Sequence, residues 1–158
     1  MSQPNVRTAI AADLDGLVSS CAALFAEDAA ERDHLRNAAW PATHGAEWCT
    51  GLLADPNALV LVATTGDEEV VGHLIGGFRP PSEMWTASRA ELVSMYVRPA
   101  VRGGGAGGRL IDGFVAWARD RGAARLEVNA YAANENALRL YERHGFRRHS
   151  VQLVADAP

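Results

Sequence analysis

The feature that most constrains the fold is a strand, a glycine-rich loop and a helix that follow one another in the second half of the chain. Residues 91–97 are nearly continuously apolar, which is typical of a strand covered on both faces. Five glycines follow between Arg102 and Arg109, and apolar residues then recur at helical spacing. A second strand is predicted over 125–130, so this part of the chain forms a βαβ unit with two parallel strands.

The remaining pattern predicts a mixed α/β (α+β) sheet in one domain. A chain of 158 residues fits a single domain of ordinary size. The predicted order of elements is β-α-α-β-β-β-α-β-α-β. Strands are expected over residues 6–10, 58–64, 69–78, 91–97, 125–130 and 146–154, and helices over 14–25, 44–54, 134–144 and from the glycine loop to Gly122.

Composition excludes several kinds of chemistry. The chain has 15 arginines and no lysine, so it has no Schiff-base lysine, no lysine general base and no Walker-type phosphate lysine. Its two cysteines, Cys21 and Cys49, lie in no metal-binding or disulfide pattern, which indicates buried, reduced thiols. Residues 1–8 show no secretory signal, and no apolar run approaches the roughly 20 residues of a membrane span. We therefore expect a cytoplasmic protein without a metal site.

Charge is distributed unevenly along the chain. Residues 1–88 hold 4 arginines and 12 acidic residues, a net charge of −8, whereas residues 89–148 hold 11 arginines and 6 acidic residues, a net charge of +5. Either surface charge has drifted without function, or one half binds an anionic ligand and the other a cationic one. The overall net charge of −4 argues against nucleic acid as the main partner.

The glycine loop predicts an anion-binding site. Glycines at a strand-to-helix junction let the backbone approach a ligand, and the unpaired N–H groups of the first helical turn attract a phosphate. A flexible loop without a ligand is the alternative. The dinucleotide pattern G-x-G-x-x-G is present as Gly103, Gly105 and Gly108, with Glu127 at about the expected distance. It fits poorly, because residues 98–102 separate it from the strand and only about 50 residues follow it.

Two segments of the chain resemble motifs A and B of the GNAT superfamily of N-acetyltransferases. Residues 95–110, MYVRPAVRGGGAGGRL, are similar to motif A, with Arg102, Gly105 and Gly107 in its defined loop positions. Residues 134–146, NENALRLYERHGF, are similar to motif B, which reads Asn-x-x-Ala-x-x-x-Tyr followed by Gly-Phe.

The resemblance implies a single GNAT-like domain over residues 1–158. It implies a mixed central sheet of six to seven strands flanked by about four helices, with a cofactor-binding core at 91–146 and an acceptor side at 1–90. The implied reaction transfers an acetyl group from acetyl-CoA to a primary amine by direct attack in a ternary complex, without a metal. The implied cofactor-binding residues are Met95, Val97, Arg102, Gly103, Gly104, Gly105, Ala106, Gly107, Gly108 and Asn134.

The same resemblance implies two catalytic residues. Tyr141 lies seven residues after Asn134 on one helix face and matches the tyrosine that protonates the departing thiolate. Glu91 is the nearest match to the glutamate that deprotonates the attacking amine. Each has a structural alternative: a tyrosine packed on Phe146, an edge glutamate and, for Asn134, a plain helix N-cap.

An acidic rim with aromatic residues predicts an aliphatic or cationic amine as acceptor. Its acidic residues are Glu27, Asp28, Glu31, Asp33 and Glu83, and its tryptophans are Trp40, Trp48 and Trp85. Among them, Glu31, Glu83 and Trp85 are the candidate substrate-binding residues. The alternative is a solvated helix end with three half-buried tryptophans. The expected partner is a small-molecule or peptide amine, with no nucleic acid and no membrane, and the resemblance suggests a homodimer.

Two other functions remain open at this stage. One is a catalytically silent acyl-CoA-binding sensor, and a more remote one is a nucleotide-binding regulator. A sensor would need no acid for a thiolate, so the presence of both Asn134 and Tyr141 favours an enzyme.

Overall fold

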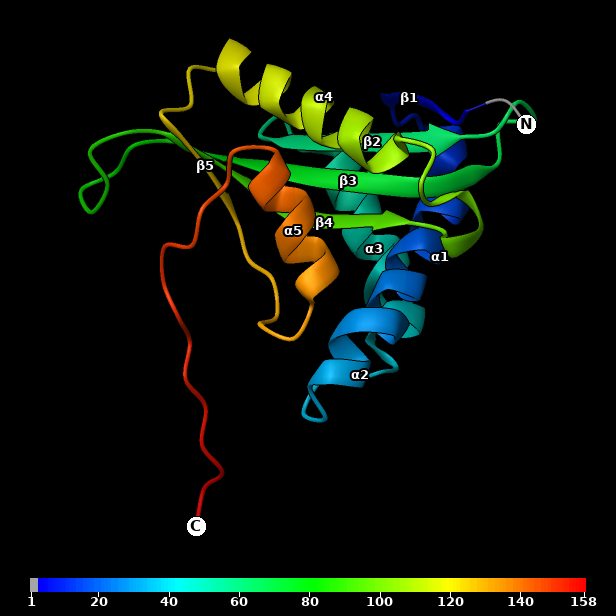
Figure 1. Cartoon of the computed structure of the whole chain (residues 1–158). Coiled ribbons are helices and arrows are strands. Elements are labelled where there is room, and N and C mark those ends of the chain that lie inside the picture. The colour runs from blue at the N-terminus through cyan, green and yellow to red at the C-terminus, as the bar shows by residue number, and fades with distance from the viewer. Residues whose placement is uncertain (1–2) are drawn as a thin grey trace.

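The computed structural model describes residues 3–158 and contains one five-stranded sheet (Figure 1). Neighbouring strands are antiparallel except for β4 and β5, which are parallel and joined by a helix. The βαβ unit predicted from the glycine-rich segment is therefore confirmed. In spatial order the strands are β1 (Asn5–Thr8), β2 (Ala58–Thr64), β3 (Val70–Arg79), β4 (Arg89–Val97) and β5 (Arg125–Val128).

Helices cover both faces of the sheet (Figure 1). One face carries α4 (Ala106–Asp120) and α5 (Glu135–Arg143), and the other carries α1 (Leu14–Leu24) and α3 (Trp40–Ala54). After α1 the helix continues as a π-helical segment, Phe25–Ala29, which is followed by the short helix α2 (Ala30–Arg32). Among residues 3–158 no helix is long and apolar enough to cross a membrane.

Alternation along the strands divides the apolar residues between two cores. The core under α4 and α5 contains Leu61 and Leu74 of the sheet together with Phe114 and Tyr141 of the helices. The core under α1 and α3 contains Leu17, Cys49, Val62 and Ile75 among its buried residues. Both cysteines are free thiols, and Cys49 is fully buried as expected, whereas Cys21 is only partly buried.

The predicted terminal strand over 146–154 is wrong for this structure, and the sheet has five strands rather than six to seven. Residues 147–158 are exposed and irregular, and they lead away from the sheet (Figure 1). Val151 and Leu153 are 83% and 88% exposed. The segment has the alternating pattern of a strand, but a strand also needs a neighbouring edge for its main-chain hydrogen bonds, and here it has none.

Strand β4 carries the irregularity that opens the sheet. Its register with β3 shifts so that Ile75 pairs with Ser94 and Gly76 with Leu92, which leaves Val93 as an extra residue in a β-bulge. On its other side, β4 pairs with β5 only as far as Leu92 opposite Val128. The last five residues of β4 therefore have a strand neighbour on one side only.

Candidate functional site

The opening between β4 and β5 exposes main-chain groups at the position where sequence analysis expected the cofactor arm. The Arg98 N–H donates to the Val71 carbonyl of β3, at 2.8 Å. Main-chain groups of successive strand residues point to opposite sides, so those of Met95 and Val97 point away from β3, into the opening. An extended ligand with its own amide groups can lie along such an edge as an added strand.

The glycine loop leads from this opening to the start of α4. Gly103 and Gly105 have φ values of +86° and +83°, a conformation that other residues adopt only with strain. Gly105 is the N-cap of α4, and no side chain caps this helix end. The N–H groups of its first turn are thus available to an anion. A Cβ atom on Gly103 would meet nothing within 4 Å, so the loop borders open space.

Arg102 points away from the glycine loop. Its Nε donates to the Val97 carbonyl at 2.8 Å, and its Nη2 donates to both carboxylate oxygens of Glu27, at 2.8 and 3.0 Å. The guanidinium also lies over the Tyr96 ring, 5.4 Å from its centroid. Arg102 therefore links the end of β4 to the π-helical segment and occupies one of the two main-chain positions expected to meet the cofactor.

Helix α5 places Asn134 and Tyr141 on the other wall of the opening. Asn134 is the N-cap of α5, because its Oδ1 accepts a hydrogen bond from the Ala137 N–H at 3.2 Å. Its Nδ2 donates to Asp28 Oδ1 at 3.2 Å. Since Asp28 follows α1 on one face and Asn134 precedes α5 on the other, this contact bridges the two sides of the sheet. The helix N-cap that was the structural alternative for Asn134 is therefore present, and its role in binding the cofactor stays a prediction.

Tyr141 is a buried tyrosine whose pKa is raised. It is 9% exposed and packs edge-on against Phe146, with ring centroids 5.8 Å apart. Burial, and secondly the charge of Asp28, raise the pKa of Tyr141 to about 12. The phenol is therefore protonated throughout the neutral range. The packing on Phe146, which was the structural alternative for Tyr141, is present, and the catalytic role of Tyr141 stays a prediction.

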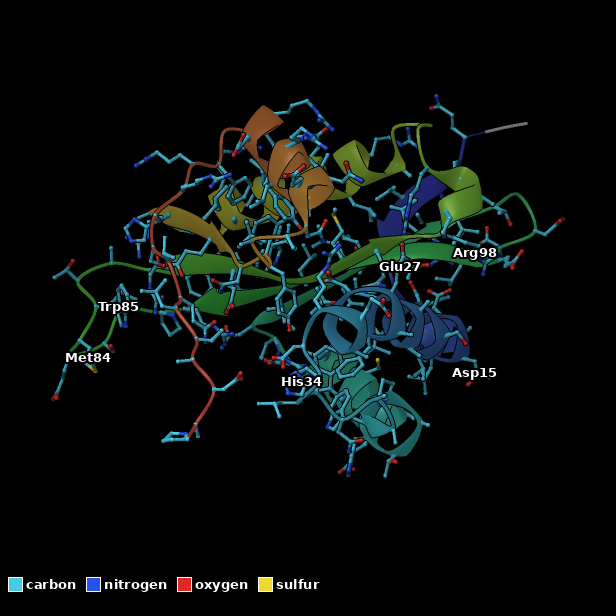
Figure 2. The ribbon with its side chains drawn as sticks, turned by 60° about the horizontal axis from the view of Figure 1, so that its bottom comes forward. Asp15, Glu27, His34, Met84, Trp85 and Arg98 are labelled. Carbon is cyan, nitrogen blue, oxygen red and sulfur yellow. The ribbon has the colours of Figure 1, made fainter. Side chains whose placement is uncertain are left out.

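The π-helical segment supplies two carboxylates of the predicted acidic rim, Glu27 and Asp28. Glu27 pairs with Arg102, and burial and Glu27 together raise the pKa of Tyr96. Asp28 contacts Asn134 and Arg32. Glu27 lies where the end of α1 meets β4 (Figure 2). A π-helical turn rotates the residues that follow it, and such turns occur frequently at functional sites. The local sequence pattern does not predict this π-helical turn.

Glu91 lies on the face of the sheet that α3 covers. Its carboxylate accepts from Arg79 Nη2 at 2.8 Å. Regular alternation would point Glu91 to the same side as Met95, but the bulge at Val93 separates them, because Met95 packs under α4. Beside the bulge lies a cavity of about 230 Å³, which is lined by Trp48, Leu52, Gly77, Phe78 and Val93 among others.

The three predicted substrate-binding residues lie outside the group of side chains formed by Glu27, Asp28, Arg102 and Asn134. Glu31 is exposed on α2. Glu83 and Trp85 belong to the loop between β3 and β4, and Trp85 lies at one end of the molecule, away from Glu27 (Figure 2). Trp85 instead stacks under Arg89, whose guanidinium carbon is 3.6 Å from the ring centroid. Within residues 3–158, no group of three or more His, Cys, Asp or Glu side chains is arranged to hold a metal ion.

Comparison with known proteins gives a consistent result. The model of the "Acetyltransferase (GNAT) family" matches residues 22–146. Aminoglycoside N(6')-acetyltransferase type 1 from Stenotrophomonas maltophilia is 34% identical over 117 residues, which is 68% of this chain and 76% of that protein.

Solved structures share the fold over nearly the whole chain. A transcriptional regulator from Bacillus halodurans C-125 is 26% identical, with a TM-score of 0.76, over 98% of this chain and 100% of the other. AAC(6')-Iy in complex with the bisubstrate analogue CoA-S-monomethyl-acetylneamine has a TM-score of 0.74 at 15% identity, over 99% of both chains.

Proposed function

This chain belongs to the acetyltransferase (GNAT) family, and on that basis we propose that it acetylates a small polycationic amine by direct attack on acetyl-CoA. It is an N-acetyltransferase, since both the family model and a curated relative are acetyltransferases. The observation that carries the finer proposal is the opening between β4 and β5, with Tyr141 and Asn134 on one side and Glu27 and Asp28 on the other.

The proposed donor site consists of groups that can bind the pyrophosphate and the pantetheine arm of coenzyme A. The uncapped start of α4 and the loop from Gly103 to Gly105 suit the pyrophosphate. The free main-chain groups of Met95 suit the amides of the pantetheine arm, and the Asn134 amide lies on the opposite wall. Val97 would join them once Arg102 leaves its carbonyl.

The acceptor site follows from the two carboxylates. Glu27 and Asp28 come from consecutive positions of the π-helical segment and lie partly exposed beside the opening. Two adjacent carboxylates favour an acceptor with more than one ammonium group over a monoamine. The aminoglycoside substrate named for the relative from Stenotrophomonas maltophilia has this chemistry, which supports the same class here.

The reaction forms one bond and breaks one. The acceptor nitrogen attacks the thioester carbonyl, an N–C bond forms, the C–S bond breaks, and the nitrogen loses a proton. Glu91 is the proposed proton acceptor, after release from Arg79. Tyr141, with a pKa of about 12 against about 8.5 for a thiol, keeps its proton and donates a hydrogen bond to the leaving sulfur. The thiolate then takes its proton from water.

Free-thiol release with acetyl-CoA and a panel of amines tests this proposal. The panel contains a 2-deoxystreptamine aminoglycoside, spermidine, a single-ammonium amine and a peptide with a free N-terminus. We expect kcat/KM for the aminoglycoside to exceed that for the monoamine by at least about 100-fold, if two charge-assisted contacts each contribute about tenfold. Preferential release with the peptide, or release with no amine in the panel, would overturn the proposed acceptor class.

A further inference from the structure

His73 of β3 is a buried imidazole with a hydrogen-bond partner on each ring nitrogen. Its Nδ1 lies 2.6 Å from Ser20 Oγ of α1, and its Nε2 lies 2.8 Å from Ser94 Oγ of β4. His73 is fully buried, and burial lowers its pKa to about 3, so the ring is neutral. A neutral imidazole has one N–H group and one acceptor nitrogen, and the two hydroxyls can satisfy both. The ring therefore links α1 to β4, and the proposed reaction does not use it.

The bulge at Val93 turns Ser94 from one face of the sheet to the other. In a regular strand every second residue shares a face, so Ser94 would accompany Leu92 toward α4. In the structure Ser94 is instead paired with Ile75, which is buried in the core under α1 and α3, whereas Leu92 is buried under α4. Bulges often re-aim a side chain beside an active site. The bulge is therefore the reason that the Ser94 hydroxyl reaches His73.

Ser94 also lies beside the opening between β4 and β5. It is two residues beyond Leu92, the last residue of β4 that pairs with β5. Its side chain is partly exposed, whereas His73 is fully buried. Tyr96 is the next residue on this face, about 7 Å further along the strand, and it is close enough to Glu27 for that carboxylate to raise its pKa. Ser94 therefore lies between the bulge and a carboxylate of the proposed acceptor site.

The Ser94 hydroxyl can bind a ligand while it stays bound to His73. In one tautomer of the ring, Ser94 donates its hydrogen to Nε2, and both lone pairs of its oxygen remain free. In the other tautomer the Nε2–H group donates to Ser94, and one lone pair remains free. Within residues 3–158 the Ser94 side chain makes no other hydrogen bond. Its oxygen is therefore a fixed hydrogen-bond acceptor beside the opening, and an N–H group is the donor that an amine offers.

We propose that Ser94 orients the attacking nitrogen of the acceptor by accepting a hydrogen bond from one of its N–H groups, and that His73 holds the Ser94 hydroxyl in place. This inference rests on the proposed transfer of an acetyl group to an amine. Holding one N–H group restricts rotation of the nitrogen, so its lone pair faces the thioester carbon for a larger fraction of the time. Ser94 forms no covalent bond and takes no proton. His73 is a positioning residue that acts through Ser94.

A double-mutant cycle tests the positioning role of His73. His73→Leu removes both hydrogen bonds of the ring with little change in volume, so it should lower kcat severalfold in the native chain. In a chain that already carries Ser94→Ala, the same substitution should have no further effect on kcat. A further fall there would show that His73 acts other than through Ser94 and would overturn its positioning role. Circular dichroism establishes that each variant is folded, and if His73→Leu is unfolded, the shorter and polar His73→Asn takes its place.

Thiol release by Ser94→Ala and Ser20→Ala, with the panel amine that the native chain acetylates fastest, tests the role of Ser94. Ser20→Ala is the matched control, because it removes the other hydroxyl from the same imidazole, on the buried side. We expect Ser94→Ala to lower kcat about tenfold, with KM for acetyl-CoA unchanged, because one hydrogen bond to the attacking nitrogen is lost. Ser20→Ala should keep kcat within about threefold of the native value.

The other outcomes overturn the role of Ser94 and distinguish it from the proposed function. An equal fall of kcat in both variants would mean that only the packing around His73 matters. An unchanged kcat in Ser94→Ala would remove Ser94 from the reaction, while thiol release by the native chain would leave the proposed function intact. If the native chain released no thiol with any amine of the panel, the proposed function would fail, and the role of Ser94 with it.

Discussion

Tyr141 carries a protonated phenol and Asp28 carries a carboxylate, and the two side chains lie close enough for the charge of Asp28 to affect the pKa of Tyr141. The phenol is buried and protonated, and the carboxylate that helps to raise its pKa reaches it from the other face of the sheet, through Asn134. In the proposed reaction the phenol donates a hydrogen bond to the sulfur and the carboxylate binds an ammonium group of the acceptor. Neither a binding module nor a structural domain needs this combination.

Replacing Tyr141 by Phe separates its catalytic role from its packing. The ring keeps its contact with Phe146, so we expect thermal stabilisation by acetyl-CoA to be unchanged. Turnover should fall roughly 100-fold, because a hydrogen bond to the leaving sulfur is lost. Steady-state thiol release measures kcat, and Tyr131→Phe is the matched control. An unchanged kcat with every acceptor would remove Tyr141 from the reaction.

Asp28→Asn tests the recognition of charge. The amide keeps the size of the side chain but removes its charge, so KM for a polyamine acceptor should rise about tenfold while KM for acetyl-CoA stays the same. The exposed carboxylate Asp120, far along α4, provides Asp120→Asn as the control. An equal effect on both substrates would indicate a general loss of structure rather than a lost ammonium contact.

His73 predicts how stability depends on pH. Its ring is fully buried between Ser20 Oγ, at 2.6 Å, and Ser94 Oγ, at 2.8 Å, with Cys21 Sγ at 3.7 Å, and burial lowers its pKa to about 3. The unfolded chain takes up a proton near pH 6.5 and the folded chain does not, so stability falls as pH decreases below 6.5. The slope should be about 1.4 kcal/mol per pH unit.

Urea denaturation between pH 7 and 5 measures this slope before ordinary carboxylates titrate. His73→Gln keeps two hydrogen-bonding atoms near the serines and removes the titrating ring, so its stability should be nearly constant over the same range. A native protein whose stability is also constant there would mean that His73 takes up a proton in the folded state.

The sequence pattern predicts the helices and strands whose bounds are marked by residues nearby in the sequence. Residues 58–64 form β2 with the predicted bounds, and the apolar run at 91–97 forms most of β4. The helices that follow the glycine loop and Asn134 were also predicted, because glycine and a capping side chain mark their starts.

Features that depend on distant partners could not be predicted in the same way. The bulge at Val93 exists only in the register with β3, and the π-helical turn leaves no mark in a helical pattern. For this reason the sequence pattern does not distinguish Glu27 and Asp28, adjacent residues of the π-helical segment, from Glu31 in α2. The prediction of a strand over 146–154 was wrong for the same reason: these residues alternate as in a strand, but in the structure they pair with no strand of the sheet.

The glycine loop gives a prediction at the element scale. Gly105 has a φ of +83°, so Gly105→Ala should cost about 1 kcal/mol in stability and weaken donor binding, because the start of α4 must shift. Gly104 has an ordinary φ, and a Cβ there would lie 3.6 Å from the Val101 carbonyl, an ordinary contact. Gly104→Ala should therefore leave stability within about 0.5 kcal/mol of the native value. Chemical denaturation and acetyl-CoA titration compare the two variants, and equal losses would contradict this role of Gly105.

For the whole molecule, the two unevenly charged parts of the sequence contribute different groups beside the opening between β4 and β5. The acidic first part of the chain contributes Glu27 and Asp28, and the basic second part contributes the glycine loop and Arg102. The two parts meet in the ion pair between Glu27 and Arg102, whose side chains are both nearly half exposed, so the pair itself contributes little to stability. Its groups are therefore available to charged ligands at little cost.

In the proposed reaction the acetyl group moves directly from donor to acceptor within one complex of donor, acceptor and protein. Initial rates of thiol release, with acetyl-CoA and an aminoglycoside varied against each other, test it most directly. Direct transfer predicts double-reciprocal lines that intersect, because both substrates must occupy the opening between β4 and β5 before the acetyl group moves. Parallel lines, with an acetylated protein detected by mass spectrometry in the absence of acceptor, would contradict it, since they would require a covalent intermediate on the chain.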